Sequence, residues 1–316
     1  MLTEPMIIDG RSILPGQTRF IEIDVARLPS GTLIHMPIHV FRSENPGPCI
    51  LFSGGLHGDE INGVEIVRRI IDSSWINNLK CGTVIALPII NVYGFNQFSR
   101  DVPDGKDVNR SFPGSPDGSL ASIVANILTD KILPHVDFGI DFHTGGASRT
   151  NYPQTRFAPI DKRAAEIAND FAAPFTLHSG LISGSLRSTA NDLDVPIVVF
   201  EGGESLRFDR FAIKEAVKGV KRVLIKQRMI DRKSPKPKEQ LVLKNSTWVR
   251  ADASGLFVPS RLSGKKVYEG QTIGKIDNPY NQFSQSVHSP KDGYIIGHNN
   301  MPLVHRGDAL FHIAEL

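Results

Sequence analysis

The sequence contains few of the features that mark secreted, membrane-bound or disulfide-rich proteins. Only two cysteines, Cys49 and Cys81, occur among its 316 residues, and each stands beside a predicted strand. We expect reduced, buried thiols, because a disulfide framework needs more cysteines. No uncharged apolar run approaches the roughly 20 residues of a membrane span, and the first residues lack the basic start and apolar core of a signal peptide. We therefore expect a cytoplasmic protein that has no membrane partner.

An excess of charge is also absent. The formal net charge is +3 at pH 7, with 22% charged residues, whereas a nucleic-acid-binding surface normally shows a stronger basic bias. A nucleic-acid partner is therefore not expected. The hydrophobic content of 40% is ordinary for a globular protein. Because the chain is longer than a domain with one compact core usually is, two domains are predicted.

Strand and helix patterns alternate over the first two thirds of the chain. Two stretches with alternating polarity, 19–25 and 34–40, are predicted to be antiparallel edge strands with one face in water. A segment rich in Gly, Pro, Asp and Asn, 91–119, predicts a long irregular loop, either functional or disordered. The pattern as a whole is typical of an α/β fold, a mixed β-sheet flanked by helices. Buried strands are predicted at 49–52, 82–88, 137–142 and 196–200, and helices at 62–71, 120–133, 162–171 and 211–230.

A polar, proline-rich stretch, 233–238, marks the predicted domain boundary. The domains are predicted to comprise 1–235, which carries the catalytic residues, and 240–316, a smaller all-β barrel- or sandwich-like domain with short strands between Gly and Pro residues. The second domain is similar to the barrel-sandwich folds of biotin and lipoyl carriers but has no lysine on its hairpin 298–302. We expect it to shield the site or to form a homo-oligomer contact.

The turn that follows the strand at 49–52 carries His57 and Glu60. Ligand sites of α/β sheets lie on such turns, between the end of a strand and the following helix. An imidazole nitrogen and a carboxylate oxygen three residues apart can bind one metal ion, and both suit Zn²⁺. The alternative is a helix-capping turn with a surface His and Glu. We predict two metal ligands here.

A third ligand is predicted at the end of a neighbouring strand. His143 follows the strand at 137–142, and Asp141 lies two residues earlier, on the same strand face. A carboxylate in this position can orient a ligating imidazole. Three protein ligands leave one position of a catalytic zinc ion open for water. The alternative is a capped or solvent-facing histidine.

A zinc-bound water needs a base, and Glu201 is the predicted one because it directly follows the most hydrophobic strand of the chain. Glu204, in the same segment, is the rival. The predicted loop supplies cations. Arg100 could stabilise the oxyanion that forms during attack on an amide carbonyl, and the neighbouring Asn109 and Arg110 suit a substrate carboxylate. These side chains could instead bind acidic neighbours and cap the loop.

Taken in order along the chain, these motifs resemble the succinylglutamate desuccinylase/aspartoacylase family, part of the zinc carboxypeptidase-like superfamily. The resemblance covers essentially the whole chain. It rests on His57-Gly58-Asp59-Glu60, Arg100, Asp107-Val108-Asn109-Arg110, Asp141-Phe142-His143 and Glu201.

This resemblance implies a zinc carboxypeptidase-like fold with one Zn²⁺ per chain. It also implies a role for each motif: His57, Glu60 and His143 as zinc ligands, Glu201 as general base, Arg100 at the scissile carbonyl, and Asn109 with Arg110 at a substrate carboxylate. Arg187 is predicted to add a substrate contact, with a surface role as the alternative.

The sequence therefore predicts a zinc-dependent amidohydrolase that deacylates an N-acyl amino acid or a related small amide. Two alternatives stay open. The first is a carboxypeptidase that acts on small peptides, and the second is a binding protein that keeps the metal without turnover. The sequence does not predict which acyl group or amine the substrate carries.

Overall fold

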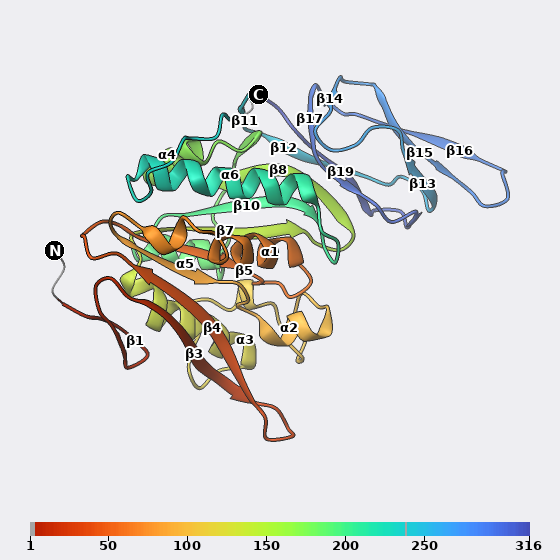
Figure 1. Cartoon of the computed structure of the whole chain (residues 1–316). Helices are drawn as coiled ribbons and strands as arrows, with labels where there is room; N and C mark the ends of the chain where they lie inside the picture. The colour runs from red at the N-terminus through yellow and green to blue at the C-terminus, as the bar shows by residue number, and fades with distance from the viewer. Residues whose placement is uncertain (1–3, 238) are drawn as a thin grey trace.

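The computed structural model describes residues 4–237 and 239–316 (Figure 1). Its main feature is a large mixed sheet in the strand order β12-β19-β17-β8-β10-β7-β5-β6-β4-β3, joined at the side by β9, β11 and β14. These strands comprise β3 (Thr18–Arg27), β4 (Leu33–Arg42), β5 (Cys49–Gly54), β6 (Thr83–Leu87), β7 (Phe138–Gly145), β8 (Arg149–Phe157), β9 (Phe175–His178), β10 (Ile197–Glu204), β11 (Leu241–Leu243), β12 (Ser246–Arg250), β14 (Lys266–Val267), β17 (Gly293–Asn299) and β19 (Ala309–Ala314).

Helices cover both faces of the part of this sheet formed by residues 1–235 (Figure 1). Apolar residues of α1, α4 and α6 pack on one face, and those of α3 and α5 pack on the other. The helices are α1 (Ile61–Ile71), α2 (Val92–Gln97), α3 (Leu120–Ile127), α4 (Lys162–Phe171), α5 (Leu186–Asp192) and α6 (Arg210–Lys226), with short 3₁₀ turns at Ile76–Asn78, Val108–Arg110 and Leu133–His135 and a π-helical turn at Leu128–Ile132.

Three neighbouring strands, β5, β7 and β10, are parallel and form the centre of the sheet. Phe52, Phe142 and Phe200, one from each strand, are fully buried. The ring centroid of Phe142 lies 6.3 Å from that of Phe52 and 6.0 Å from that of Phe200. Parallel strands end at the same edge of a sheet, so this shared core brings the residues at the three carboxyl ends together.

The C-terminal region forms a four-stranded antiparallel sheet, β16-β15-β13-β18, and also extends the large sheet. Strand β17 pairs with β8 on one side and with β19 on the other, and β19 in turn pairs with β12. The remaining strands are β1 (Met6–Ile8), β2 (Arg11–Ile13), β13 (Gly255–Pro259), β15 (Thr272–Asp277), β16 (Ser284–His288) and β18 (Leu303–Val304). The expected α/β fold with a smaller all-β C-terminal part is confirmed. The boundary near 235–240 stays a prediction, and Lys238 lies outside the described residues.

Several local expectations were wrong. Strand β4 lies between β3 and β6, so of the two strands predicted at an edge only β3 lies at one. The predicted loop 91–119 contains α2 and a 3₁₀ turn, and Asn91 caps α2 by accepting from the Gly94 amide. The helix predicted over 211–230 ends at Lys226. Cys81 is only half-buried, although both cysteines are free as expected. Strands β8 and β9 and helix α5 were not predicted.

Candidate metal centre and active site

The turn between β5 and α1 holds His57 and Glu60 at the carboxyl edge of the parallel strands. Glu60 is the residue before α1, yet its side chain makes no capping hydrogen bond and turns away into the site. Gly58 lets the turn pack closely on α2, because a Cβ there would lie 1.9 Å from the Gly94 carbonyl carbon. The turn is therefore built by a close backbone approach that leaves both side chains facing one point.

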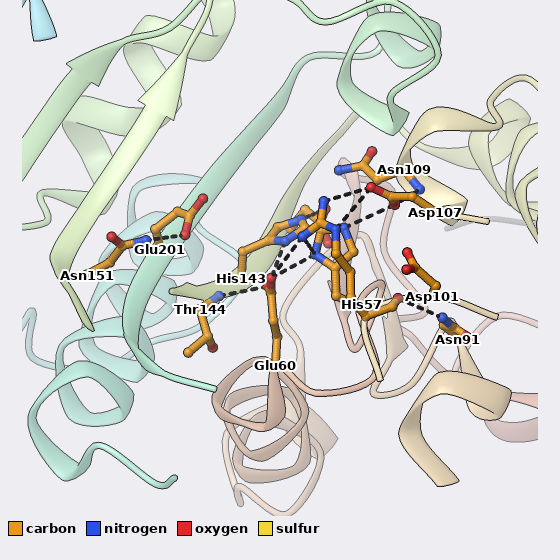
Figure 2. Close-up of polar contacts among 12 residues, drawn as sticks. His57, Glu60, Asn91, Asp101, Asp107, Asn109, His143, Thr144, Asn151 and Glu201 are labelled. Atoms are coloured by element: carbon orange, nitrogen blue, oxygen red, sulfur yellow. Dashed lines mark hydrogen bonds and ion pairs between the residues drawn. The ribbon is translucent and has the colours of Figure 1, made fainter. Parts of the chain in front are cut away.

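His57, Glu60 and His143 meet in a buried cluster, and one potential ligand atom from each lies within 4.8 Å of the others. Nδ1 of His57 lies 2.8 Å from Oε1 of Glu60, and Nδ1 of His143 lies 2.9 Å from Oε2. All three residues are at most 5% exposed. Figure 2 shows the Glu60 carboxylate between the two imidazoles. The expected convergence of these three residues is thus present in the structure.

Further hydrogen bonds orient these side chains. Nε2 of His143 donates to Oδ2 of Asp141 over 2.7 Å, so its Nδ1 faces Glu60. Asp141 is itself held by the Ser53 hydroxyl, which donates to Oδ1 over 2.7 Å. The backbone amide of Thr144 donates to Oε2 of Glu60. Such outer contacts fix the ring orientation of metal-ligating histidines.

The imidazoles and the carboxylate of the cluster interact strongly with one another. Burial alone would raise the pKa of Glu60, but His57 and His143 outweigh burial and hold that pKa well below its usual range. Burial alone would lower the pKa of His143, but Asp141 and Glu60 raise it well above its usual value. Nε2 of His57 is buried without a hydrogen-bond partner among the described residues, 3.3 Å from Oδ1 of Asp107. Two imidazoles and an ionised carboxylate are a donor set that suits Zn²⁺.

Glu201 lies inside β10, which runs on to Glu204 rather than ending at Phe200. Its Oε2 accepts a hydrogen bond of 2.7 Å from Nδ2 of Asn151, and its Oε1 lies 3.3 Å from Nη1 of Arg156. Both partners belong to β8, which pairs antiparallel with β10. The Glu201 side chain is 14% exposed and lines the same cavity as the His–Glu–His cluster.

Arg100 lies directly beside the predicted metal ligands. Its Nη1 is 3.2 Å from Nδ1 of His57 and 3.7 Å from Oε1 of Glu60. Asp107 accepts hydrogen bonds from Nε and Nη2 of Arg100, over 3.1 and 2.8 Å. The guanidinium is therefore held by one carboxylate at the edge of the cluster, while its side chain is still 40% exposed.

Asn109 and Arg110 lie on the 3₁₀ turn Val108–Arg110, where Asp107 accepts from the Asn109 amide as its cap. Oδ1 of Asn109 accepts from the Leu186 backbone amide over 3.0 Å, which ties this turn to the start of α5. Arg110 is exposed, and both side chains line the cavity. Both residues therefore lie beside the cavity, although the side-chain oxygen of Asn109 already accepts a hydrogen bond within the fold.

The cavity has a volume of about 510 Å³ and collects residues from distant parts of the chain. Arg187 lines it with a guanidinium whose Nη1 is buried and has no hydrogen-bond partner among the described residues. Burial, together with the nearby Arg156, lowers the pKa of Arg187 to about 10. Nη2 of Arg187 is held by Ser179 and the Gly180 carbonyl. A poorly paired buried cation of this kind favours an anionic partner.

The sequence analysis gave no role to several residues that line the cavity, among them Arg149, Asn151 and Arg156 on β8, and Trp248 on β12. Trp248 comes from the C-terminal region, stacks on His312 with centroids 4.1 Å apart, and lies under Arg149 at 5.5 Å. The polar pattern of β8 does not resemble a central strand, and the position of Trp248 depends on the pairing of β17 with β8. A local sequence signal for Trp248 is therefore absent.

The chain has an α/β fold with a buried His–Glu–His cluster that could hold a metal ion, and this cluster lines a polar cavity. Residues 46–226, more than half of the chain, match the family model described as the succinylglutamate desuccinylase/aspartoacylase catalytic domain. The chain therefore belongs to this family, and the resemblance seen in its motifs is confirmed.

Relatives support this assignment over nearly the whole chain. The N-alpha-acetyl-L-2,4-diaminobutyric acid deacetylase of Halomonas elongata is 27% identical over 302 residues, which cover 90% of this chain and 86% of that protein. The crystal structure of a succinylglutamate desuccinylase/aspartoacylase from Rhodobacter sphaeroides is 26% identical, with a TM-score of 0.84 and 95% of each chain covered. The product-bound ectoine utilization protein EutE (DoeB) from Ruegeria pomeroyi, 22% identical with a TM-score of 0.85 and the same coverage, shares the fold. Within the described residues, no helix is long and apolar enough to cross a membrane.

Proposed function

We propose that this protein is a zinc-dependent amidohydrolase that removes the acyl group from an N-acyl amino acid or a related small amide. The observation that carries the proposal is that the buried cluster of His57, Glu60 and His143 shares one cavity with Glu201 and Arg100. Family membership and the deacetylase from Halomonas elongata support hydrolysis of an amide bond.

In this proposal His57, Glu60 and His143 hold one Zn²⁺ per chain. When bound, such an ion acidifies a water ligand and polarises a carbonyl oxygen. Glu201 removes a proton from the attacking water, whose oxygen then bonds to the amide carbon. Glu201 returns that proton to the amide nitrogen as the C–N bond breaks, so the products are a carboxylic acid and an amine.

Arg100 is assigned to the carbonyl oxygen. Its guanidinium is fixed by Asp107 and lies within 3.7 Å of the ligand cluster, so it is placed to donate to negative charge that develops there. Because it is held before the substrate arrives, little reorganisation is needed during the reaction.

Asn109, Arg110 and Arg187 are assigned to a substrate carboxylate. Arg187 supports this assignment best, since one of its buried nitrogens lacks a partner within the described structure. Asn109 can donate through Nδ2 while its Oδ1 stays bound to the Leu186 amide. The cavity also contains Arg149 and Arg156, and this concentration of cations favours substrates that carry at least one carboxylate.

We also propose the domain division at 235–240, a cytoplasmic location and a homo-oligomer contact on the C-terminal region. Trp248 supports a role for that region at the cavity, because it reaches the cavity wall from β12.

A substrate screen on one purified sample tests the proposal. N-acetyl, N-succinyl and N-formyl amino acids should be hydrolysed, with about one metal ion per chain in the same sample. Dipeptides should be poor substrates. Cleavage of dipeptides in preference to N-acyl amino acids would favour the carboxypeptidase alternative, and bound metal without turnover on any substrate would favour a binding protein.

A further inference from the structure

The proposed base, Glu201, is held by a residue for which neither the family assignment nor the motifs provide a role. Asn151 is 9% exposed, and its Nδ2 donates to Oε2 of Glu201 over 2.7 Å (Figure 2). This is the shortest contact to the Glu201 carboxylate, since Arg156 lies 3.3 Å from the other oxygen. The amide therefore fixes Oε2 of Glu201, while Oε1 lies in an ion pair with Arg156.

The opposite side of the Asn151 amide lies against the C-terminal region. Gly297 of β17 is the ladder partner of Asn151, and a Cβ at position 297 would lie 2.6 Å from Oδ1 of Asn151. Only the absence of a side chain at 297 gives the amide its room. Because Oδ1 points toward Gly297, the donor group Nδ2 points toward Glu201.

The junction between β8 and β17 is well fixed around this contact. Nε2 of Gln154 donates to the Ile296 carbonyl over 3.1 Å, and Nδ2 of Asn300 donates to Oγ1 of Thr150 over 2.8 Å. Ser263 donates to the Thr150 carbonyl over 3.1 Å. Each of these hydrogen bonds joins β8 to the C-terminal region, so the position of Asn151 is set by both parts of the chain.

We propose that Asn151 is a positioning residue for Glu201 and that Gly297, in the C-terminal region, holds the Asn151 amide in its donating orientation. The proposal rests on the function assigned above. It gives the C-terminal region a part in catalysis that runs from Gly297 through Asn151 to the base. A base that is displaced by about 1 Å can lose on the order of 10²-fold in rate.

The test uses three variants in the full-length, metal-loaded protein. Asn151→Ala removes the donor, and Asn151→Asp keeps the shape but faces Glu201 with a second carboxylate. Gly297→Ala adds the methyl group that meets Oδ1. We expect kcat to fall by about 10- to 100-fold in the Asn151 variants and by about 10-fold in Gly297→Ala, with KM and metal content within twofold of the wild type.

Two comparisons separate positioning from general damage. Ile295→Val lies on the same strand but in the C-terminal core, and it should lower the melting temperature while leaving kcat within twofold. In a Glu201→Gln background, Asn151→Ala should cause no further loss, because residues that act as one unit are not additive. A full additional loss in that background would overturn the proposal.

Crystal structures of the Asn151→Ala and Gly297→Ala variants give a readout that does not depend on turnover. The Glu201 side chain should occupy more than one rotamer in both. If the wild type hydrolyses N-acyl amino acids and Glu201→Gln abolishes this, but Asn151→Ala keeps normal kcat and an ordered Glu201, the positioning role alone is wrong. If the wild type hydrolyses none of them, the proposed function is wrong, and the Glu201 rotamers still decide the Asn151 contact.

Discussion

Nε2 of His143 lies 2.7 Å from Oδ2 of Asp141, and both residues are buried on the same face of β7. The carboxylate fixes the ring so that Nδ1 faces Glu60, 2.9 Å away. The Ser53 hydroxyl holds the other oxygen of Asp141. The predicted metal ligand is therefore oriented by a neighbour that does not need to touch the ion.

Replacing Asp141 by Asn should weaken metal binding, because the amide no longer accepts as a carboxylate does and the ring loses its fixed orientation. We expect about a 10- to 100-fold loss of Zn²⁺ affinity, measured by competition with a chromophoric chelator. Asp137→Asn is the matched control. Asp137 precedes β7 at its opposite end and accepts from the Cys49 amide, so its replacement should leave the affinity unchanged.

Gly58→Ala should destabilise the turn that carries His57 and Glu60. The new Cβ would lie 1.9 Å from the Gly94 carbonyl carbon and 2.0 Å from the Phe95 nitrogen, so α2 must move. We expect the free energy of unfolding to fall by about 1–3 kcal/mol, together with a loss of metal affinity, in urea titrations and chelator competition. Gly180 has open space around its Cβ position, and Gly180→Ala should change stability by less than about 0.5 kcal/mol. Equal stability of the two variants would show that the turn is not close-packed.

The buried imidazole of His312 should make the protein sensitive to acid. Burial first, then Arg156 and Lys291, lower the pKa of His312 from 6.5 to about 3. Below pH 6.5 the unfolded chain takes up a proton at His312 and the folded chain does not. The contribution of the neutral imidazole to the free energy of unfolding is therefore fully present above pH 6.5 and is lost as the pH drops toward 3. The contribution to the slope is about 1.4 kcal/mol per pH unit between pH 6 and pH 4.

His312→Phe preserves the stack on Trp248 but removes the titrating group. Urea unfolding at pH 7, 6, 5 and 4 should show a shallower loss of stability than in the wild type, by about that slope. An identical slope in the two proteins would contradict a buried neutral imidazole at this position.

Trp248→Ala should widen the range of substrates. The indole lines the cavity from the C-terminal region and is held between His312 and Arg149. Its removal opens space for a longer acyl or amine portion. We expect kcat/KM for a substrate longer by several methylenes to rise by about 10-fold relative to N-acetyl substrates. A parallel change for short and long substrates would mean that Trp248 does not limit substrate size.

The sequence was sufficient to predict that His57, Glu60 and His143 converge, because they lie at or just after the carboxyl ends of parallel strands with clear hydrophobic patterns. Strand β5 is buried along its whole length, as is β7. Residues that follow such strands meet at one edge of the sheet, so His57, Glu60 and His143 could be grouped without knowledge of the pairing.

Strand β8 could not be predicted in the same way. It lies between β10 and β17 in the interior of the sheet, yet it includes Arg149, Asn151, Pro153 and Arg156. Polar residues occur there because several of them face the cavity, and sites of this kind depart from the usual hydrophobic pattern. The place of Trp248 depended on that missed strand, through the pairing of β17 with β8.

Metal content and deacylation rate, measured together on one sample before and after chelation, test the central claim most directly. We predict about one Zn²⁺ per chain, loss of hydrolysis of N-acyl amino acids when the metal is removed, and recovery when one equivalent of Zn²⁺ is added back. Glu201→Gln should keep the metal and lose about 10²- to 10⁴-fold in kcat. Full hydrolytic activity in metal-free protein, or in Glu201→Gln, would contradict the account.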